Sequence, residues 1–501
     1  MQSNRKPSNK RRMTRRQYEA MMRRRRQNRI AAAFLGALAL ILVVIVVLIL
    51  RQYPAAPKDQ VIASNATAVP AATAEPVQQT TADAALTGAV MTAVPSLTDT
   101  PAPTAGPEGA SQEDFPAMGI SSAQRSILDV DFGFTDAPTA EPVLTPSPTP
   151  RVRAEGDPLR SVRMRVVGDI MVCDSQLSYA KKMDYDFHDQ FMMIADILQN
   201  ADYTMGNMEG TVGKYKTMGY SGYPNFNCPE TILETLKDDG IDFLTLANNH
   251  MLDRYFDGMK NTVTWVEQYG FDHVGAYRTQ TERDTPVIYD INGIRFGFVA
   301  YTHSTNTYER VSDPQGVAIG VPYLYKCDIE ADIKKLRDAG AEVVVAWPHW
   351  GAEYIREPDS DQTKYARRLA MAGADIILGS HSHMVQPMAT YDVPDGNGGT
   401  RQVFCIFSLG NFISDHSLQY TDNGVVLDFT VKEHENGSFT VENIGYIPTY
   451  TWKQSGGVRV LPSGRYLNSR PKGMDDANYS RLKASYYEIC DVLGDYPVLT
   501  E

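Results

Sequence analysis

Apolar runs typical of β-strands alternate with segments of helical periodicity between residues 160 and 450 of this chain. The helical segments lie at 187–201, 229–240, 258–270, 326–340 and 360–373. The strand-like runs lie at 163–170, 203–209, 242–249, 342–350 and 376–379, with further β-like segments at 401–410, 424–433 and 438–447. The stretch 286–301 predicts two strands around Asn292-Gly293, which is a strong hairpin signal. This alternation predicts an α/β protein with a mixed sheet or two stacked sheets.

Polar side chains gather at the carboxyl ends of the predicted strands. Functional groups in such sheets collect where strands end and loops begin. The residues at these ends are Asp169, Asn207, Glu209, Asn248, Asn249, His250, Asp253, His349, Glu353, His381, His383 and Asn411. No Lys or Arg is among them, and carboxylates that cluster without a cation repel one another. A divalent metal at the centre removes this difficulty.

The chemistry of these side chains narrows the choice of metal. Asp, Glu, Asn and His together suit Zn²⁺, Mn²⁺ or Fe²⁺, and no cysteine accompanies them. The seven or eight candidate ligands are too many for one tetrahedral ion and would fit two. Taken singly, Gly168-Asp169 could be a turn, 207–209 a helix cap, His349 a core histidine and 381–383 a surface pair. Their shared position at strand ends favours the metal site.

Six segments, taken in chain order, resemble the bacterial capsule-synthesis proteins of the CapA type. They are VVGDIM, GNMEG, LANNHMLD, PHWGAEY, GSHSHMVQP and FSLGNF, and the resemblance covers about residues 160–450. These proteins are linked to poly-γ-glutamate capsule production and are similar in turn to the calcineurin-like metallophosphoesterases. The resemblance implies a four-layer α/β/β/α sandwich of metallophosphoesterase type with a two-metal centre.

The resemblance also implies a role for each residue of the site. It implies metal ligands at Asp169, Glu209, Asn249, His349, His381 and His383. Glu209 stands where a carboxylate bridges the two ions, and His250 resembles the general acid. The residues expected to orient these groups are Asn207, Asp253, Glu353 and Asn411.

Three positions depart from the pattern of the phosphoesterases. Their first motif is Asp-x-His, but Ile170 and Met171 follow Asp169 here. The bridging position holds Glu209 in place of an aspartate, and the segment RYFDG after Asp253 is bulkier than expected. One metal therefore lacks an expected imidazole, so a site without catalysis is an alternative.

The first 159 residues differ sharply in composition from the rest. Residues 1–29 hold twelve Lys or Arg and one acid, and they predict a basic cytoplasmic tail. Residues 30–50 carry no charge and predict a single transmembrane helix, with a cleaved signal peptide as the alternative. Residues 51–159 are rich in Pro, Ala and Thr and predict a disordered linker. We therefore expect the C-terminal domain to lie outside the cell membrane.

Charge excludes one class of partner. The tail holds a formal charge of +11, which leaves −23 for the rest of a chain whose total is −12. An acidic exterior argues against nucleic acid as a partner. The five cysteines are widely and irregularly spaced, so they fit no disulfide framework or thiolate zinc site, although one disulfide could form.

We expect a membrane-anchored, extracellular protein that supports poly-γ-glutamate capsule biosynthesis or export and has a metal-dependent, hydrolase-like site. Its expected partners are the lipid bilayer around residues 30–50, subunits of a membrane polymer synthase, and a polyanionic or phosphorylated envelope substrate. The alternatives are a non-catalytic accessory subunit, a phosphoesterase acting on another envelope substrate, and a surface adhesin. Residues 451–501, with a helix predicted at 475–494, are expected to form a C-terminal extension packed on the domain at 160–450.

Overall fold

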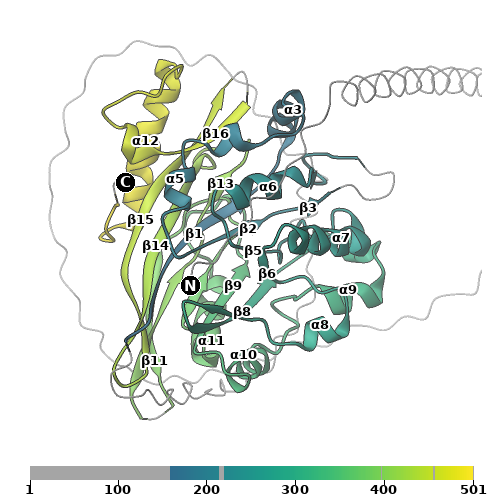
Figure 1. Ribbon diagram of the computed structural model, residues 1–501, viewed down its shortest axis with the longest axis vertical. Coiled ribbons are helices and arrows are strands. Elements are labelled where there is room, and N and C mark those ends of the chain that lie inside the picture. The colour runs from purple at the N-terminus through teal and green to yellow at the C-terminus, as the bar shows by residue number, and fades with distance from the viewer. Residues whose placement is uncertain (1–157, 214–218, 397, 455–456, 500–501) are drawn as a thin grey trace, which may run out of the picture. The chain divides into compact units, whose positions relative to one another are not determined.

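The computed structural model describes residues 158–213, 219–396, 398–454 and 457–499 (Figure 1). The predicted cytoplasmic tail, the predicted transmembrane helix and almost all of the predicted linker lie outside the described residues. Within the described part, no helix has the length and apolar character needed to cross a bilayer. The predicted α/β class is confirmed, because strands of two mixed sheets alternate with helices along the chain.

The first sheet holds eight strands. Their order is β16-β15-β14-β1-β2-β5-β6, with β13 paired to β1 beside this path. The bounds are β1 (Ser161–Ile170), β2 (Tyr203–Met208), β5 (Phe243–Thr245), β6 (Asp272–Val274), β13 (Asn411–Ile413), β14 (Asn423–Glu433), β15 (Phe439–Gln454) and β16 (Gly457–Pro462). The strands β1, β2, β5 and β6 are parallel, whereas β14 runs antiparallel to β1. The carboxyl ends of β1, β2 and β5 therefore meet at one end of this sheet.

The second sheet holds six strands in the order β11-β12-β10-β9-β8-β7. The bounds are β7 (Ile288–Ile291), β8 (Ile294–Thr302), β9 (Val343–His349), β10 (Ile376–Leu378), β11 (Met388–Pro394) and β12 (Thr400–Ile406). The four inner strands are parallel, and the two outer strands pair antiparallel with their neighbours. The predicted hairpin turn between β7 and β8 is confirmed. Asn292 and Gly293 both have positive φ, at 49° and 82°.

The two sheets pack face to face over a common apolar core. Val166, Met205 and Phe243 of the first sheet meet Phe298 and Trp347 of the second in this core. The rings of Phe243 and Phe298 stack at 4.5 Å between centroids. Burial of such side chains is the main favourable contribution to stability, at about 1.5–3 kcal/mol each.

Helices cover the other face of the first sheet. They are α3 (Asp174–Lys182), α4 (His188–Phe191), α5 (Ala195–Leu198), α6 (Thr231–Asp238) and α7 (Tyr255–Gln268). α6 shows why this layer forms, since it buries Ile232, Leu233 and Leu236 on one face and ends before Gly240, whose φ is 97°. Two short strands, β3 (Thr211–Val212) and β4 (Asn227–Cys228), pair with each other in this region.

The outer face of the second sheet is covered by α10 (Ile329–Asp338) and α11 (Ser360–Ala372). α11 begins at a capping box formed by Asp359 and Gln362 and ends at Gly373, whose φ is 117°. The connections after β6 and β8 contain α8 (Gln280–Asp284), η1 (Tyr308–Arg310) and α9 (Pro314–Gly320). Helices thus flank both stacked sheets.

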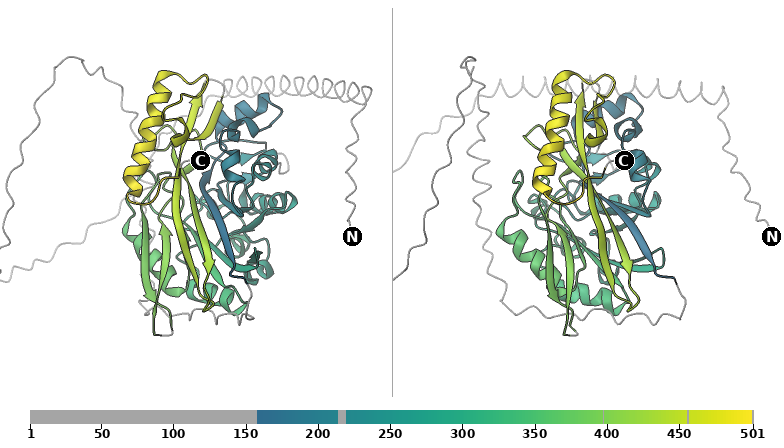
Figure 2. Two further views of the ribbon diagram at one scale, coloured as in Figure 1. Left: turned by 60° about the vertical axis from the view of Figure 1, so that its left-hand side comes forward. Right: turned by 90° about the vertical axis from the view of Figure 1, so that its left-hand side faces the viewer.

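Residues beyond 450 belong to the first sheet and its core. The predicted division at 450 falls inside β15, which is followed by β16 and η2 (Ser463–Tyr466). The helix predicted at 475–494 is confirmed as α12 (Asp476–Leu493). α12 contributes Ile489 and Leu493 to the core between the sheets and lies on the opposite side of the first sheet from α3 (Figure 2).

Some predicted elements differ from the structure. The helix predicted at 187–201 is wrong as a single element, because Ile194, with φ at −123°, separates α4 from α5. The apolar residues of this segment lie on two short helices, of which α4 buries Phe191 and α5 buries Ile197. The strand predicted at 242–249 ends at Thr245, and the next residues form the loop that carries Asn249. All five cysteines are free.

Candidate metal centre

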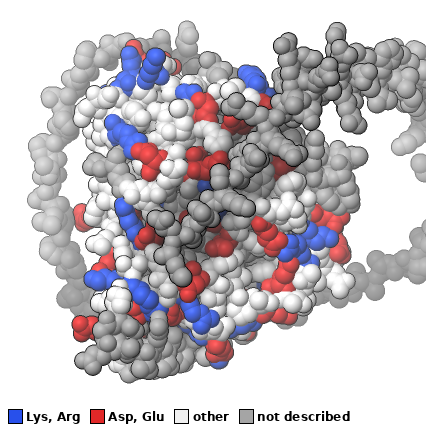
Figure 3. Space-filling view, in the orientation of Figure 1, with Lys and Arg blue, Asp and Glu red and all other residues white. Residues whose placement is uncertain are grey.

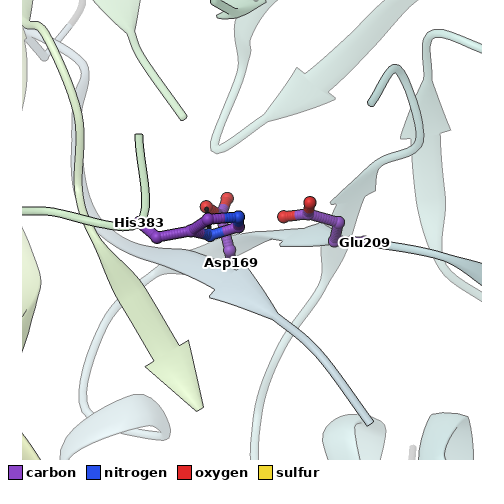
Figure 4. A group of neighbouring side chains, drawn as sticks. All are labelled: Asp169, Glu209 and His383. Atoms are coloured by element: carbon purple, nitrogen blue, oxygen red, sulfur yellow. Dashed lines mark ion pairs between the residues drawn. The ribbon is translucent and has the colours of Figure 1, made fainter. Parts of the chain in front are cut away.

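Three ligand-type side chains from three segments meet at the ends of the parallel strands. Asp169 lies in β1, Glu209 directly follows β2, and His383 lies in the loop after β10. One ligand atom from each lies within 4.8 Å of the other two, and all three side chains are buried. Figure 4 shows the carboxylate of Glu209 pointing toward Asp169 and His383. We call these three residues the first ligand group.

A second ligand group, made of Asn249, His349 and His381, adjoins the first. Nε2 of His349, at the end of β9, lies 3.0 Å from Oδ1 of Asn249 and 3.1 Å from Nδ1 of His381. The same Nε2 atom lies 3.7 Å from Oε1 of Glu209. Glu209 therefore stands between the two groups, at the position for which a bridging carboxylate is predicted.

The state of Glu209 tests whether these residues fit a metal. Both of its carboxylate oxygens are buried, and neither accepts a hydrogen bond from the residues that the structure describes. The 3.7 Å separation from His349 is too long for a hydrogen bond. A buried carboxylate without donors is costly unless a cation balances it. Carboxylates, imidazoles and an amide oxygen suit Zn²⁺, Mn²⁺ or Fe²⁺, so the two groups fit a pair of such ions.

The pKa values of the cluster follow from burial and mutual charge. Burial and the neighbouring Asp169 raise the pKa of Glu209 well above its ordinary value. Burial lowers the pKa of His349 and of His381, which keeps both imidazoles in the neutral form that binds metals. Burial also opposes a charge on His383, but Glu209 and Asp169 outweigh it and raise the pKa of His383 to about 9. Metal binding must therefore displace protons from Glu209 and His383.

Two asparagines orient the first ligand group. Sheet register places Asn207 of β2 on one side of Asp169 and Asn411 of β13 on the other. Nδ2 of Asn207 donates to Oδ1 of Asp169 at 2.7 Å. Nδ2 of Asn411 donates to the carbonyl of Thr421 at 3.0 Å, which turns its Oδ1 toward Nδ1 of His383 at 2.9 Å. With a metal bound, His383 would keep its proton on Nδ1 and offer Nε2 as the ligand nitrogen.

The loop that carries His381 and His383 has an uncommon backbone conformation. Both residues have positive φ, at 98° and 57°. Such conformations cost about 1–3 kcal/mol each and cluster at functional sites. The loop is held by Ser380, whose Oγ accepts from the indole of Trp347 at 2.8 Å, and by the amide of His381, which donates to Oδ2 of Asp169 at 3.3 Å.

His250 and Asp253 form a buried pair beside the metal ligands. Oδ2 of Asp253 lies 2.8 Å from Nδ1 of His250 and also accepts the backbone N–H of Phe226 at 2.6 Å. The Phe226 ring packs edge-on against the imidazole at 4.6 Å. Position and tautomer of His250 are therefore fixed from two sides, which suits a proton donor.

Glu353 behaves differently from the other residues predicted to orient ligands. Its side chain is exposed, and within the described chain it makes no hydrogen bond to a predicted metal ligand. Its charge nevertheless contributes to the raised pKa of His383. The structure therefore gives Glu353 an electrostatic influence on the site and no orienting contact.

Sequence reasoning missed three residues of the site. The rings of His303 and His381 lie 4.4 Å apart, and those of His416 and His383 lie 4.8 Å apart. Nδ2 of Asn306 lies 3.4 Å from Nε2 of His250. His303 directly follows β8, so the signal that identified the other candidates applied to it as well, whereas β13, which precedes His416, has only three residues.

Comparison with known sequences finds similarity to bacterial capsule synthesis proteins. The model of the family described as "Bacterial capsule synthesis protein PGA_cap" matches residues 163–416. The "Capsule biosynthesis protein CapA" of Bacillus anthracis is 27% identical over 279 residues, which cover 54% of this chain and 64% of that protein. The "PGA biosynthesis protein CapA" of Bacillus subtilis is 28% identical over 299 residues, which cover 59% of this chain and 74% of that protein. The match thus spans slightly less than two thirds of the B. anthracis relative.

Comparison with solved structures finds weaker likenesses. The calcineurin-like phosphoesterase YfkN from Bacillus subtilis aligns with a TM-score of 0.36 and 15% identity, over 67% of this chain and 99% of that one. The NAD nucleotidase NadN of Haemophilus influenzae aligns with a TM-score of 0.35 and 14% identity, over 66% of this chain and 68% of that one.

Proposed function

The chain belongs to the bacterial capsule synthesis protein family PGA_cap, and from this membership and its buried ligand groups we propose that it supports capsule synthesis as a metal-dependent hydrolase. One observation carries the proposal. Glu209 lies between two groups of metal-binding side chains, and neither of its buried oxygens has another partner in the described chain. A purely structural carboxylate would be expected to have hydrogen-bond donors.

The two ligand groups would hold one divalent ion each and share Glu209. Bound ions would supply Lewis-acid stabilisation of the negative charge that develops on the group being cleaved. Asn207 orients Asp169 through a hydrogen bond of 2.7 Å, and Asn411 orients His383 through one of 2.9 Å. Burial of the whole cluster excludes bulk water, which strengthens every electrostatic interaction in it.

We assign protonation of the leaving group to His250. Asp253 accepts from Nδ1 at 2.8 Å and would stabilise the imidazolium form of His250, from which Nε2–H can protonate the leaving atom of a substrate. Asn306 lies 3.4 Å from Nε2 and offers an amide to the same group of the substrate. Donation from Nε2 serves the cleavage of either a phosphate ester or an amide bond.

The substrate that we propose is an anionic envelope polymer of the poly-γ-glutamate type. The B. subtilis relative is named for PGA biosynthesis, which supports this choice. On the face drawn in Figure 3, Lys and Arg side chains are interspersed with Asp and Glu. Recognition of a polyanion would be local to the metal centre, since the net negative charge outside residues 1–29 repels it at long range.

Location and partners complete the proposal. Residues 30–50 would anchor the chain in the cell membrane with the basic tail in the cytoplasm, and residues 51–159 would hold the catalytic domain away from the outer surface of the membrane. Subunits of a membrane polymer synthase are the proposed neighbours of the anchor.

A second candidate is a non-catalytic accessory subunit of such a synthase. It is favoured by the buried, apolar Ile170 and Met171, which follow Asp169 and bring no imidazole to the first ligand group. Such a protein would retain metal without turnover.

Assays on the full chain purified in detergent separate the two candidates. Hydrolysis of γ-linked glutamate oligomers and of a phosphate ester is measured beside bound metal, for the wild type and for His250→Ala. The enzyme proposal predicts turnover that His250→Ala strongly reduces while metal is retained. Metal without turnover of either substrate would favour the accessory subunit, and turnover only of the phosphate ester would favour a phosphoesterase of another envelope substrate.

A further inference from the structure

A pocket of about 360 Å³ lies among α8, η1, α9 and the segment that precedes α10, away from the ligand groups described above. We propose that this pocket binds a small organic anion, with a carboxylate or phosphate head held by Arg283 and Lys326 and an apolar flank against α9. The proposal is independent of the catalytic function.

Arg283 is the main reason for expecting an anion. Its side chain is partly buried in the pocket wall, with Nη2 at 3.0 Å from Sγ of Cys327 and the guanidinium 5.0 Å from the centre of the Tyr277 ring. Nη1 is buried and has no hydrogen-bond partner, and the guanidinium forms no ion pair with any residue that the structure describes. Asp332 supplies an opposite charge without an ion pair to Arg283, so an anion in direct contact with the guanidinium would stabilise it further.

A bound water explains only part of this arrangement. Arg283 also lines a smaller cavity of about 30 Å³ together with Tyr301 and Asp332. A cavity of that size holds a water molecule, which could accept a hydrogen bond from Nη1. Such a water could also link Nη1 to the carboxylate of Asp332, but it places no anion in the larger pocket that Arg283 lines with Lys326.

Lys326 adds a second cation at the rim of the same pocket. Nζ lies 4.6 Å from the ring centre of Tyr323 and 5.3 Å from that of Tyr325, and it forms no ion pair within the described residues. The pocket has one acid, Glu309, whose Oε2 already accepts from Thr305 at 2.7 Å. Two cations therefore face one engaged carboxylate, which favours an anionic ligand.

Another wall of the pocket is apolar and favours a ligand with an aliphatic part. It is made by Pro314, Val317, Ala318 and Val321 of α9 and the residues next to it. A ligand with a short aliphatic part can bury it here while its head reaches Arg283, and burial of each methylene contributes about 0.8 kcal/mol. Butyrate carries both features, whereas butyramide has the same shape without the charge.

The alkylation rate of Cys327 reports whether a ligand occupies this pocket. It lines the pocket and is partly exposed, as is Cys490 on α12, whereas the other three cysteines are buried. The full chain is treated with iodoacetamide, and alkylation of Cys327 and of Cys490 is followed by peptide mass spectrometry in the same sample. We expect butyrate to slow alkylation of Cys327 about tenfold at ten times its dissociation constant and to leave Cys490 unchanged.

Variants locate the head-group contacts. Arg283→Gln and Lys326→Gln should remove the protection, and Lys326 is exposed, so its replacement leaves the fold intact. Lys334→Gln, on the exposed face of α10, should keep the protection. Protection by inorganic phosphate in addition to butyrate would support the contact between the anionic head group and these two cations.

Three results would overturn the proposal. The first is an alkylation rate of Cys327 that neither butyrate nor phosphate changes. The second is equal protection by butyramide, which would remove the role of charge. The third is protection by phosphate alone, which would remove the apolar flank and with it the proposed class of ligand.

Discussion

Nδ1 of His250 lies 2.8 Å from Oδ2 of Asp253, and both side chains are buried. The same oxygen accepts the backbone N–H of Phe226 at 2.6 Å, so Asp253 cannot rotate away without losing two hydrogen bonds. Burial raises the pKa of Asp253, while the hydrogen bond from His250 opposes that rise. The carboxylate thus fixes the orientation of the His250 ring and would stabilise its imidazolium form, in which Nε2 also carries a proton.

Replacement of either member of this pair should lower turnover and leave metal content unchanged. We expect His250→Ala to reduce the rate of hydrolysis about 10²–10⁴-fold, the usual contribution of a positioned proton donor. Asp253→Asn should also reduce it, because a neutral amide cannot stabilise the imidazolium from which Nε2 donates a proton. Asp338→Asn, an exposed change on α10, is the control. An unchanged rate in His250→Ala would exclude it as the proton donor.

Without metal, the chain should lose stability as the pH rises from 6.5 to 9. The pKa of His383 is raised to about 9 in the folded chain, so its contribution is fully present below the unfolded value and is lost as the pH rises through the folded value. The difference corresponds to about 3 kcal/mol. The raised pKa of Glu209 acts in the same direction.

Urea unfolding of the chelated full chain at pH 6.5 and 9 measures this loss, with His383→Asn as the variant in which the pH dependence should shrink. Added metal should reverse the trend, because ligands must lose protons to bind it. A chelated chain that gains stability over this pH range would contradict the charges assigned to the first ligand group.

Gly168→Ala should disrupt the end of β1. A Cβ atom at this position would lie 1.9 Å from the carbonyl oxygen of Gly410, which is backbone and cannot move aside easily. We expect a loss of about 3 kcal/mol in unfolding free energy, together with weaker metal binding, because Asp169 is the next residue. Gly219→Ala meets open space and is the control. Equal stability of the two variants in thermal unfolding would argue against the close strand approach.

The fold class could be predicted from the sequence because strand and helix periods are local. The strand predicted at 203–209 is observed as β2, and the one predicted at 342–350 as β9. The order of strands could not be predicted, since it depends on pairing between distant segments. β13 has only three residues, yet it lies beside β1 and brings Asn411 next to Asp169.

The site was predictable to the extent that polar groups follow predicted strands. Asp169, Glu209 and His383 lie together because parallel strands carry their ends to one place. His416 was overlooked because its strand, β13, is too short to leave a periodic pattern. Glu353 follows a strand closely, but its loop turns it to solvent, and no local pattern distinguishes it from its buried neighbours.

Asp428→Asn should destabilise the first sheet. Oδ2 of Asp428 accepts from Nε of the fully buried Arg165 at 2.7 Å, and the substitution removes this carboxylate charge from beside a buried guanidinium. The expected loss is about 3–5 kcal/mol of unfolding free energy. Glu442→Gln breaks a solvent-exposed pair with Lys432 and is the control, because water and salt screen such pairs and their loss changes stability little. If urea unfolding gives similar losses of unfolding free energy for Asp428→Asn and Glu442→Gln, burial does not determine how much the ion pair between Arg165 and Asp428 contributes to stability.

The metal content of the purified full chain tests the role of Glu209. We predict about two divalent ions per chain in the wild type, since two adjoining groups of ligands share this carboxylate. Glu209→Gln keeps the shape of the side chain and should lose both ions, whereas His381→Ala should lose one. Elemental analysis that finds no bound divalent ion in the wild type, or an unchanged content in Glu209→Gln, would contradict the metal centre.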